Sequence, residues 1–368
     1  MFSITFYFFI VVVAIQFFYY VIVFRCFAFS KPEKKTANNL SVSVIVCAKN
    51  EHENLQKYIP ILLEQEYANF EIVLIDDASR DDSLEVMEEF EKQNSNIKLI
   101  KVENNEAFWG NKKFALTLGI KAAKFDNLLF IDADCYPNSK NWIQEMSNEF
   151  TNDKKIILGY GAYKKIKGSF LNKIIRFETM FVATQYFSWA KLGKPYMGVG
   201  RNLAYNRKEF YQVNGFNSHM KLRSGDDDLF INEVSNFNNT SICFSPESFT
   251  YSEPKTNFKE WVFQKRRHIT TASYYKFFDK MQLSLFYFTQ ISFILLSIYL
   301  MIFEFQWIIV LVIIAFRYLF TCIVIGYSAS KLKEKDVMYW FPVIELTLVF
   351  SQLCFFVLNL FSKPVHWK

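Results

Sequence analysis

Glycine and proline are scarce in this sequence, which has 11 glycines and 8 prolines among 368 residues. Such low numbers exclude a collagen-like repeat and a Gly/Pro-rich linker. Intrinsic disorder is excluded as well, because hydrophobic residues make up 51% and aromatic residues 19% of the chain. The length allows one large domain or two. The apolar residues gather at both ends, whereas the middle of the chain has the composition of a soluble enzyme.

Paired cysteines and blocks of basic residues are also missing. The six cysteines form no CxxC pair and have no histidine at the spacing of a zinc site. We interpret them as reduced, mostly buried thiols, which suits a cytosolic catalytic domain. The formal net charge is +6 without a continuous basic run, which indicates a protein that faces membrane lipids rather than a nucleic-acid binder.

Long apolar runs are present at both ends of the chain. Residues 4–24 carry no charge and lack the basic start and small-residue cleavage site of a signal peptide, so we predict a retained anchor. Three further runs long enough to span a bilayer follow, at about 283–303, 306–327 and 339–361. Arg317 and Glu345 fall inside two of these runs, and we predict that each makes a contact between helices.

Basic residues flank these runs unevenly, and cytoplasmic loops are the ones that carry excess lysine and arginine. The turn between the second and third runs contains Glu304 and no basic residue. Basic residues lie after the first run, before the second and after the third: Arg25, Lys31, Lys34, Lys35, Lys265, Arg266, Arg267, Lys276, Lys280, Lys331, Lys333 and Lys335. We therefore predict a multi-pass protein of the cell membrane with residues 30–280 in the cytoplasm and both ends outside, although Lys363 and Lys368 argue against the last step.

Short apolar strands alternate with helical patterns in the first half of the middle region. The strand patterns cover 42–48, 71–79, 97–102 and 127–134, and helices are expected from about Asp82 to Glu91 and around 112–124. This alternation predicts a doubly wound α/β sheet. In such sheets ligands bind beyond the carboxyl ends of the strands.

Acidic residues lie at two of these strand ends, Asp76 and Asp77 at one and Asp132 and Asp134 at the other. Because Asp132 and Asp134 are two residues apart, both can place oxygens on one hard cation, Mg²⁺ or Mn²⁺, with phosphates completing its shell. Such an ion neutralises charge that develops on a diphosphate leaving group. A helix N-cap or a solvated turn is the alternative, and the preceding apolar strand favours the metal.

The order of these segments resembles the family-2 inverting glycosyltransferases with a GT-A fold, over roughly residues 41–270. The segments that carry the resemblance are VSVIVCAKNE, IVLIDDASRDDS, GNKKFALTLG and LLFIDAD, in that order. The resemblance implies a Rossmann-like domain that binds a nucleotide sugar. It places Asp76 and Asp77 near the base and ribose of the nucleotide and Lys112 near the donor. A solvated helix start is the alternative for Lys112 and Lys113.

The same resemblance makes Asp132 and Asp134 the DxD motif of the family, with Asp134 as the metal ligand. The segment MGVGRNLAYNR at 197–207 resembles the glycine-rich stretch whose asparagine and tyrosine line the sugar pocket, which assigns Asn202 to the substrate. Glycines let the backbone approach a ligand closely. As a bare pattern, the segment also suits a tight turn before a strand.

Three adjacent carboxylates lie at the start of a predicted helix in SGDDDLFIN, at 224–232. Their mutual repulsion can raise one pKa and prepare a base, or the group can bind a cation. The helix dipole also favours carboxylates at this position, which is the alternative. The segment resembles the family's (E/G)-(D/E)-D motif, which supplies the general base. We assign this role to Asp227, with Asp226 as the second choice, because an inverting displacement needs one base on the acceptor hydroxyl.

A basic helix is predicted around Gln264-Lys265-Arg266-Arg267-His268. Gln264, Arg267 and His268 are spaced i, i+3 and i+4, so they share one face, where Arg267 can clamp a diphosphate. The segment resembles the QxxRW motif of cellulose, chitin and hyaluronan synthases and of ceramide glucosyltransferases. His268 replaces the tryptophan, so any stacking of an acceptor depends on an imidazole. Binding to anionic lipid headgroups is the alternative, and one helix can do both.

Residues 168–190 carry Phe170, Ile174, Phe177 and Phe181 on one helical face. This pattern predicts an amphipathic helix at the membrane surface, with an ordinary helix packed on the sheet as the alternative. An interfacial helix would suit a lipid acceptor, or a polymer that passes into a transmembrane bundle.

We therefore expect a transmembrane anchor at 1–28, a cytosolic GT-A domain with interfacial helices at 40–280 and C-terminal transmembrane helices at 281–368. The expected activity is metal-dependent transfer of a hexose-type sugar from a nucleotide-diphosphate sugar to a lipid-linked or glycan acceptor. One alternative is a processive polysaccharide synthase, in which a channel can require a partner chain. The other is a membrane protein that only binds the nucleotide sugar. A transporter is disfavoured, because the apolar runs are mostly uniform.

Overall fold

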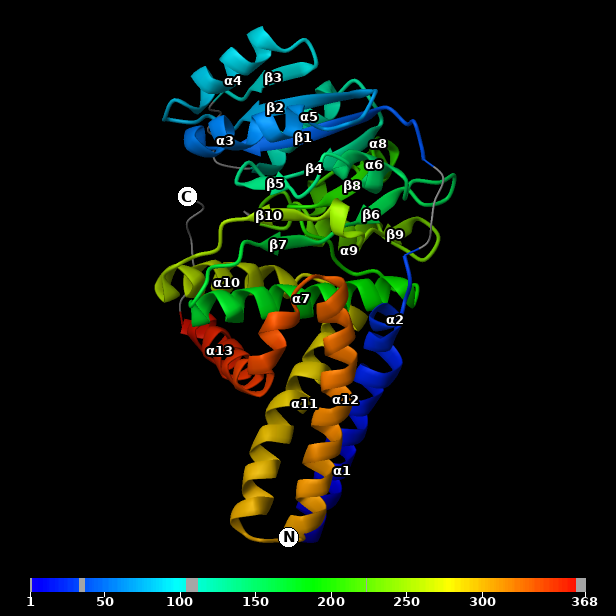
Figure 1. Cartoon of the computed structure of the whole chain (residues 1–368), viewed down its shortest axis with the longest axis vertical. Helices are drawn as coiled ribbons and strands as arrows, with labels where there is room; N and C mark the ends of the chain where they lie inside the picture. The colour runs from blue at the N-terminus through cyan, green and yellow to red at the C-terminus, as the bar shows by residue number, and fades with distance from the viewer. Residues whose placement is uncertain (1, 33–36, 104–111, 223, 362–368) are drawn as a thin grey trace. The chain divides into compact units, whose positions relative to one another are not determined.

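The structure is a computed structural model that describes residues 2–32, 37–103, 112–222 and 224–361 (Figure 1). The chain forms two compact units, which we call the sheet unit and the helix unit. The sheet unit consists mainly of Pro32–Ile166 and Gly193–Lys255. The helix unit consists of Met1–Lys31, Lys167–Leu192 and Thr256–Pro364.

A seven-stranded sheet in the order β3-β2-β1-β4-β8-β6-β9 forms the centre of the sheet unit. Its strands are β1 (Val42–Ala48), β2 (Phe70–Asp76), β3 (Ile97–Lys101), β4 (Asn127–Phe130), β6 (Ile156–Leu158), β8 (Leu203–Asn206) and β9 (Thr240–Ile242). The first four strands of the order are parallel, so their carboxyl ends meet at one edge of the sheet, which confirms the predicted α/β fold. Strand β8 is antiparallel to β4, and its first residue, Leu203, lies opposite Phe130 at that edge. The sequence pattern did not indicate this reversal.

A second sheet of three short strands follows directly from the end of β4. Its strands are β5 (Cys135–Pro137), β10 (Thr250–Ser252) and β7 (Gly161–Tyr163), with β10 in the middle. Ser252 of β10 lies opposite Cys135 on one side and Tyr163 on the other. This small sheet therefore brings residues that are far apart in the sequence next to the end of β4.

The alternating side chains of β1 and β2 are buried on both faces. A hydrophobic core joins these strands to α3 (His52–Leu63), α4 (Ser83–Gln93) and α6 (Trp142–Ser147). Helix α5 (Lys112–Ala122) packs against β1 and β2 as well. Gly119 makes this close approach possible, because a Cβ atom there would lie 2.1 Å from Cδ1 of Ile75. Two further helices of this unit are α8 (Arg207–Gln212) and α9 (Asp228–Val234).

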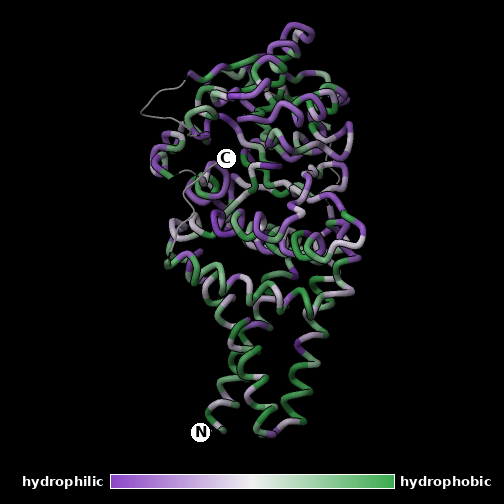
Figure 2. Tube along the Cα trace, turned by 90° about the vertical axis from the view of Figure 1, so that its left-hand side faces the viewer, coloured by the Kyte–Doolittle hydropathy of each residue, from purple (hydrophilic) through white to green (hydrophobic). Residues whose placement is uncertain are grey.

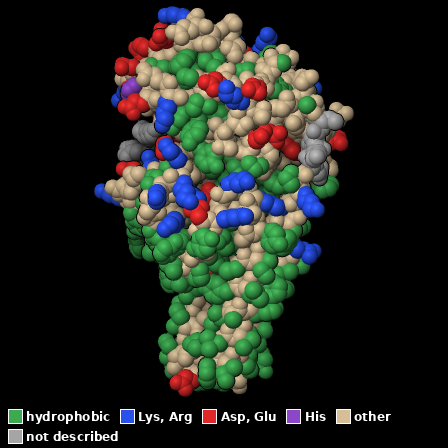
Figure 3. All heavy atoms as spheres, in the orientation of Figure 1, with side chains coloured by type: hydrophobic (Ala, Val, Ile, Leu, Met, Phe, Trp, Pro, Cys, Tyr) green, Lys and Arg blue, Asp and Glu red, His purple; other side chains and the backbone are tan. Residues whose placement is uncertain are grey.

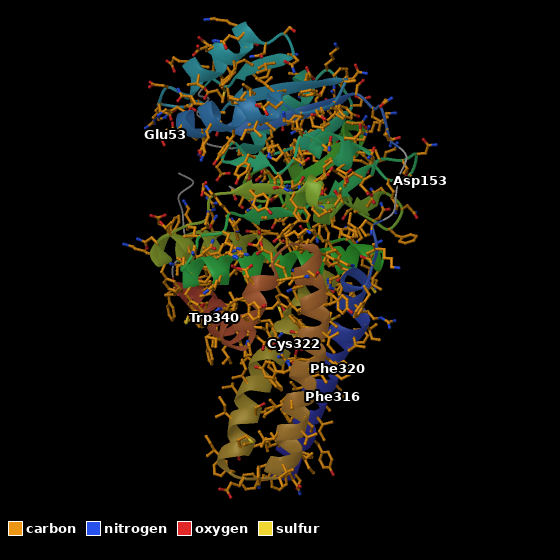
Figure 4. The ribbon with its side chains drawn as sticks, viewed as in Figure 1. Glu53, Asp153, Phe316, Phe320, Cys322 and Trp340 are labelled. Carbon is orange, nitrogen blue, oxygen red and sulfur yellow. The ribbon has the colours of Figure 1, made fainter. Side chains whose placement is uncertain are left out.

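Four helices of the helix unit are long and apolar enough to cross a membrane, in agreement with the four predicted runs. They are Phe2–Ala28, Phe277–Ile302, Trp307–Lys331 and Lys335–Phe361. The first consists of α1 (Phe2–Phe17), a π-helical segment (Phe18–Phe24) and α2 (Arg25–Ala28), and the last consists of a 3₁₀ segment (Lys335–Trp340) and α13 (Phe341–Phe361). Figure 2 shows hydrophobic residues along most of the helices near the N-terminus, and Figure 3 shows apolar side chains over much of the visible face of α11 (Phe277–Ile302) and α12 (Trp307–Lys331). Phe316 and Phe320 on α12, labelled in Figure 4, pack with their ring centres 4.4 Å apart.

A charged pair lies among these apolar helices. The Arg317 guanidinium on α12 lies 2.5 Å from the Glu345 carboxylate on α13, and it donates further hydrogen bonds to the side-chain oxygens of Gln16 (2.8 Å) and Gln290 (2.9 Å). Three other helices therefore supply partners for Arg317, which is what a charge in an apolar bundle requires. The predicted contact between helices is confirmed for both charged residues.

Two more helices, α7 (Phe170–Lys191) and α10 (Phe258–Ala272), belong to the helix unit. Helix α7 begins at Ser169, whose side chain accepts a hydrogen bond from the Asn172 backbone N–H. Glu178 of α7 and Lys265 of α10 form an ion pair at 2.9 Å. Lys and Arg side chains gather over these two helices in Figure 3. An amphipathic helix is thus present where it was predicted, and its place at a membrane surface stays a prediction.

Candidate active site

The loops after β1 and β2 are linked at the carboxyl edge of the sheet. Asn50 and Ala78 both have left-handed backbone, with φ values of 55° and 53°. The Asn50 side chain accepts a hydrogen bond from the Arg80 backbone N–H at 2.8 Å, and the Asp76 carboxylate accepts one from the Ser79 N–H at 3.2 Å. Non-glycine residues in this conformation are costly and gather at functional sites. Asp76 therefore lies at the predicted edge and shapes the turn there.

Asp77 lies beside Asp76 and is paired with Lys49. The Lys49 ammonium is 3.4 Å from the Asp77 carboxylate and donates a hydrogen bond to its backbone carbonyl at 2.7 Å. Burial raises the pKa of Asp77, while the charge of Lys49 opposes this effect. The two carboxylates predicted to bind the nucleotide are thus adjacent and buried.

Lys112 joins the two acidic segments that the sequence placed far apart. Its ammonium lies 2.8 Å from Asp132 Oδ1 and 3.0 Å from Asp226 Oδ2. The Lys112 side chain is only 14% exposed, so it is not part of a solvated helix start. Burial lowers the pKa of Lys112, but the two carboxylates outweigh burial and hold it well above its usual range. Burial also disfavours the charge on Asp226, yet Lys112 keeps the pKa of that carboxyl lowered.

Asp227 forms the N-cap of α9, and its carboxylate is held by backbone donors. Its two oxygens accept hydrogen bonds from the N–H groups of Gly200 and Asp228, each at 2.7 Å. Burial raises the pKa of Asp227 to about 7, and the charges of Asp226 and Asp228 add to this effect against the Gly200 N–H. A carboxyl group with such a pKa is partly ionised at neutral pH, which is the property of a general base.

A small cavity connects these side chains. Its volume is about 20 Å³, which is room for one water molecule. Residues from β4, α5, β8 and the start of α9 line it, among them Lys112, Asp132, Tyr205, Asp226 and Asp227. The fold therefore brings the predicted base, the predicted donor lysine and one aspartate of the DxD pair around one space.

Asp132, Asp134 and Cys135 form a candidate metal centre. Their ligand atoms all lie within 4.8 Å of one another, and Asp134 is exposed. Loss of hydration among neighbouring protein atoms raises the pKa of Asp134, and the nearby Asp132 carboxylate raises it further. Burial raises the pKa of the Cys135 thiol well above its usual range, so this thiol stays protonated. Two carboxylates without a thiolate fit a hard ion such as Mg²⁺ or Mn²⁺.

Asn202 follows Gly200 closely in the sequence but does not contact Asp227 with its side chain. It is fully buried, donates hydrogen bonds to the carbonyls of Tyr160 and Ser248 at 2.9 and 2.7 Å, and accepts one from the Trp142 indole at 3.1 Å. The fold thus accounts for its polar groups without a ligand. Its contact with a sugar stays a prediction.

Gln264, Arg267 and His268 lie on α10 and are described within the helix unit. Gln264 and Arg267 are half-buried, and His268 is exposed. The neighbouring Arg266 donates a hydrogen bond to Asn359 of α13 at 2.9 Å. The helix and the shared face are present, whereas the roles of these residues toward a diphosphate and an acceptor stay predictions.

Lys113, for which the sequence analysis offered only a solvated helix start, is a buried residue of the site. It is 1% exposed, and its ammonium donates hydrogen bonds to the carbonyls of His219 (2.9 Å), Leu222 (2.8 Å) and Ser224 (2.7 Å). Burial lowers its pKa to about 8. Lys113 thereby anchors the segment that leads to Asp226, and the paired lysines at the start of α5 are its only signal in the sequence.

Arg201 is a residue that the sequence analysis missed. Its Nη1 atom donates hydrogen bonds to the Ala162 carbonyl at 3.2 Å and to the Ser252 hydroxyl at 2.9 Å. Its guanidinium lies 4.3 Å from the centre of the Tyr163 ring. The arginine is visible in the MGVGRN segment, but the sequence does not show which residues it meets.

Comparison with known proteins shows which protein family this chain resembles. Residues 43–223 match the profile of the family described as Glycosyl transferase family 2. An uncharacterized glycosyltransferase, EpsJ of Bacillus subtilis, is 32% identical over 124 residues, which cover 34% of each chain. A poly-beta-1,6-N-acetyl-D-glucosamine synthase of Staphylococcus epidermidis is 34% identical over 93 residues, covering 25% of this chain and 21% of the synthase. The matched regions thus span a minor part of the length of these relatives.

One solved structure resembles most of the chain. The mannosyltransferase PcManGT from Pyrobaculum calidifontis, solved with GDP-Man and Mn²⁺, superimposes with a TM-score of 0.58 at 14% identity. The match covers 92% of this chain and 97% of that one. At this level of identity, the likeness concerns the fold.

Proposed function

Because residues 43–223 form a glycosyltransferase family 2 domain with a GT-A fold, we propose that this protein is a membrane-bound inverting glycosyltransferase. It transfers a hexose-type sugar from a nucleotide-diphosphate sugar to a lipid-linked or glycan acceptor. The observation that carries this proposal is the meeting of Lys112, Asp132, Asp226 and Asp227 around one cavity at the carboxyl edge of the sheet.

Asp227 serves as the general base in this proposal. The acceptor hydroxyl oxygen attacks the anomeric carbon while its proton passes to the Asp227 carboxylate. The bond between the anomeric carbon and the diphosphate oxygen breaks, and the diphosphate leaves with the electron pair. A single displacement of this kind inverts the anomeric configuration. Asp226 is a poorer base than Asp227, because its ion pair with Lys112 favours its charged form.

The donor occupies the edge formed by the ends of β2 and β4. Asp76 and Asp77 hold the nucleoside, and the Lys112 ammonium contributes positive charge near the diphosphate. Asp132 and Asp134 would hold Mg²⁺ or Mn²⁺, because two neighbouring carboxylates match the ligand preference of these ions. Such an ion, when bound, offsets the negative charge of the leaving diphosphate.

The acceptor site is proposed to lie near the membrane, with the catalytic domain in the cytoplasm. Four helices can cross a membrane, and the basic residues around them support this orientation. In this proposal Arg267 supports the leaving diphosphate, and Gln264 and His268 contribute to substrate binding. The similarity to a polysaccharide synthase keeps repeated addition to one growing product as a second candidate.

Release of nucleoside diphosphate tests the proposed activity. The full-length protein in detergent would be incubated with a panel of UDP- and GDP-sugars, with Mn²⁺, Mg²⁺ or EDTA, and with or without native lipid extract. We expect metal-dependent release that requires lipid and falls about 1,000-fold in Asp227→Asn, because the general base is lost. Release without lipid, together with a product that grows in length, would favour the processive synthase.

A matched control separates the loss of a base from the loss of one charge. Asp153, labelled in Figure 4, is an exposed residue of the sheet unit, so Asp153→Asn makes the same chemical change at the surface. Asp153→Asn should keep full activity. Donor binding without release from any sugar, or equal release from Asp227→Asn and wild type, would contradict the proposed reaction.

A further inference from the structure

Arg201 is a half-buried cation whose hydrogen bonds, among the residues that the structure describes, go to neutral groups. Its Nη1 atom is bound to neutral oxygens of Ala162 and Ser252, and its face lies against Tyr163. Among the residues that the structure describes, no carboxylate lies within ion-pair distance of this guanidinium. Charged groups that leave water are normally paired with the opposite charge. An anion supplied from outside the chain would complete this pairing.

The strand register places this cation beside the candidate metal centre. Ser252, which accepts the hydrogen bond from Arg201, lies opposite Cys135, and Cys135 directly follows Asp134. The thiol of Cys135 in turn donates to the Asp134 carboxylate at 3.3 Å. The positive charge of Arg201 opposes the raised pKa of Asp134, which agrees with this proximity.

The backbone beside Arg201 reaches the other half of the site. Gly200, the preceding residue, donates its N–H to the Asp227 carboxylate at 2.7 Å. Two neighbouring residues of one turn therefore contact the proposed base and approach the DxD pair. An anion bound at Arg201 would consequently lie beside the proposed base and the DxD pair, which is the position expected of the leaving diphosphate.

The strand order indicates which part of the donor reaches Arg201. Strands β2, β1, β4 and β8 are neighbours in this order. The proposed nucleoside site is at the end of β2, the DxD pair follows β4, and Arg201 precedes β8. A nucleotide that starts at β2 thus reaches Arg201 with the end of its diphosphate that is farthest from the base.

We infer that Arg201 binds the terminal phosphate of the nucleoside diphosphate, the phosphate that carries the sugar. This inference rests on the proposed function. A planar guanidinium presents paired N–H donors that match phosphate oxygens. The contacts with Tyr163 and Ser252, together with the bond from the Thr250 hydroxyl to the Arg201 carbonyl at 2.9 Å, hold the group in place before the ligand arrives.

Calorimetric binding of UDP, GDP, UMP and GMP to the full-length protein in detergent tests this assignment. Measurements in EDTA remove any contribution of a metal ion. Arg201→Gln should weaken the preferred diphosphate about 10- to 100-fold, because a hydrogen bond between charged groups is lost. The matching monophosphate lacks the terminal phosphate, so its affinity should change by less than about threefold.

Lys164→Gln provides a control with the same change in charge. Lys164 is exposed beyond the end of β7 and pairs with Glu253, so this variant should bind both nucleotides like wild type. Equal weakening of diphosphate and monophosphate by Arg201→Gln, or no weakening, would overturn the role of Arg201 while the proposed function stands. Wild-type protein that binds no nucleoside diphosphate would overturn both.

Arg201→Lys covers the case in which Arg201→Gln does not fold. This variant keeps the positive charge but loses the planar pair of donors. A diphosphate-over-monophosphate preference reduced about fivefold or more would support the assignment. An unchanged preference would overturn it.

Discussion

Replacing Asp227 with asparagine should stabilise the protein at neutral and alkaline pH while it abolishes sugar transfer. Burial and the charges of Asp226 and Asp228 raise the pKa of Asp227 from 3.8 to about 7. Between these two values the folded protein keeps a proton that the unfolded chain has released, so folding stability falls as the pH rises from about 4 to 7. One pKa unit corresponds to about 1.4 kcal/mol, so the ionised carboxylate costs the folded protein about 4 kcal/mol above pH 7.

Asparagine removes this cost but introduces a smaller one. Its side chain offers one oxygen to the N–H groups of Gly200 and Asp228, and its own N–H₂ group faces the other donor, which costs about 2 kcal/mol. We therefore expect a net gain of about 2 kcal/mol in the free energy of unfolding at pH 8. At pH 4 wild-type Asp227 is protonated and the cost of its charge is absent, so asparagine should lower the free energy of unfolding by about 2 kcal/mol there.

Thermal unfolding of the full-length protein in detergent, followed by tryptophan fluorescence at pH 4 and pH 8, measures this difference. A gain of about 4 °C in melting temperature is expected at pH 8 only. Asp153→Asn should change neither value. Wild-type kcat/KM for diphosphate release should rise with pH around a midpoint near 7, because the base must be ionised. A gain that is equal at both pH values, or a loss at pH 8, would refute the assignment of a raised pKa to Asp227.

Three further changes test the helix bundle, the packing of the sheet and the metal centre. Arg317→Met leaves the Glu345 carboxylate uncompensated among apolar helices and should lower the unfolding free energy by about 3–5 kcal/mol. Adding Glu345→Leu to this variant should restore most of the loss. An Arg317→Met protein that melts like wild type in detergent would contradict this prediction. Gly119→Ala puts a methyl group 2.1 Å from Ile75 Cδ1 and should cost about 1–3 kcal/mol in denaturant unfolding, of which Ile75→Val recovers a part. Overpacking against Ile75 would be excluded as the cause if Ile75→Val recovered none of the lost unfolding free energy. Asp134→Asn should weaken Mn²⁺ binding at least about tenfold in calorimetry, because a charged oxygen ligand becomes an amide, and unchanged affinity would exclude Asp134 as a ligand.

Several elements of the fold could be predicted because their signals are local. The run Val42–Ala48 is β-branched and apolar throughout, since a parallel strand is covered on both faces, and it forms β1 with the predicted ends. The helices at Phe277–Ile302 and Trp307–Lys331 follow from uninterrupted apolar length. The reversal of β8 left no such signal, because a strand of four residues reads the same in either direction.

The candidate site was predictable as a set of residues rather than as an arrangement. Asp132, Asp226 and Asp227 were identified from their acidic motifs, but the sequence did not indicate that Lys112 bridges Asp132 to Asp226. Likewise, the opposite pKa shifts of Asp226 and Asp227 follow from what surrounds them. Lys112 lowers the pKa of Asp226, whereas burial and the charges of Asp226 and Asp228 raise the pKa of Asp227.

The types of element and the residues that carry the chemistry can be recognised from the sequence alone. Strand and helix periodicity, apolar length and motif order depend on residues that are close together in the sequence, so they can be recognised without the structure. Which side chains are removed from water, and which charges meet, depends on how distant segments of the chain pack together. Lys113, with its ammonium held by three carbonyls, and Arg201, between Tyr163 and Ser252, acquire their surroundings from segments far away in the sequence. Desolvation and charge pairing act through space, so they set the pKa of Asp227 and the surroundings of the Arg201 charge only after the chain has folded.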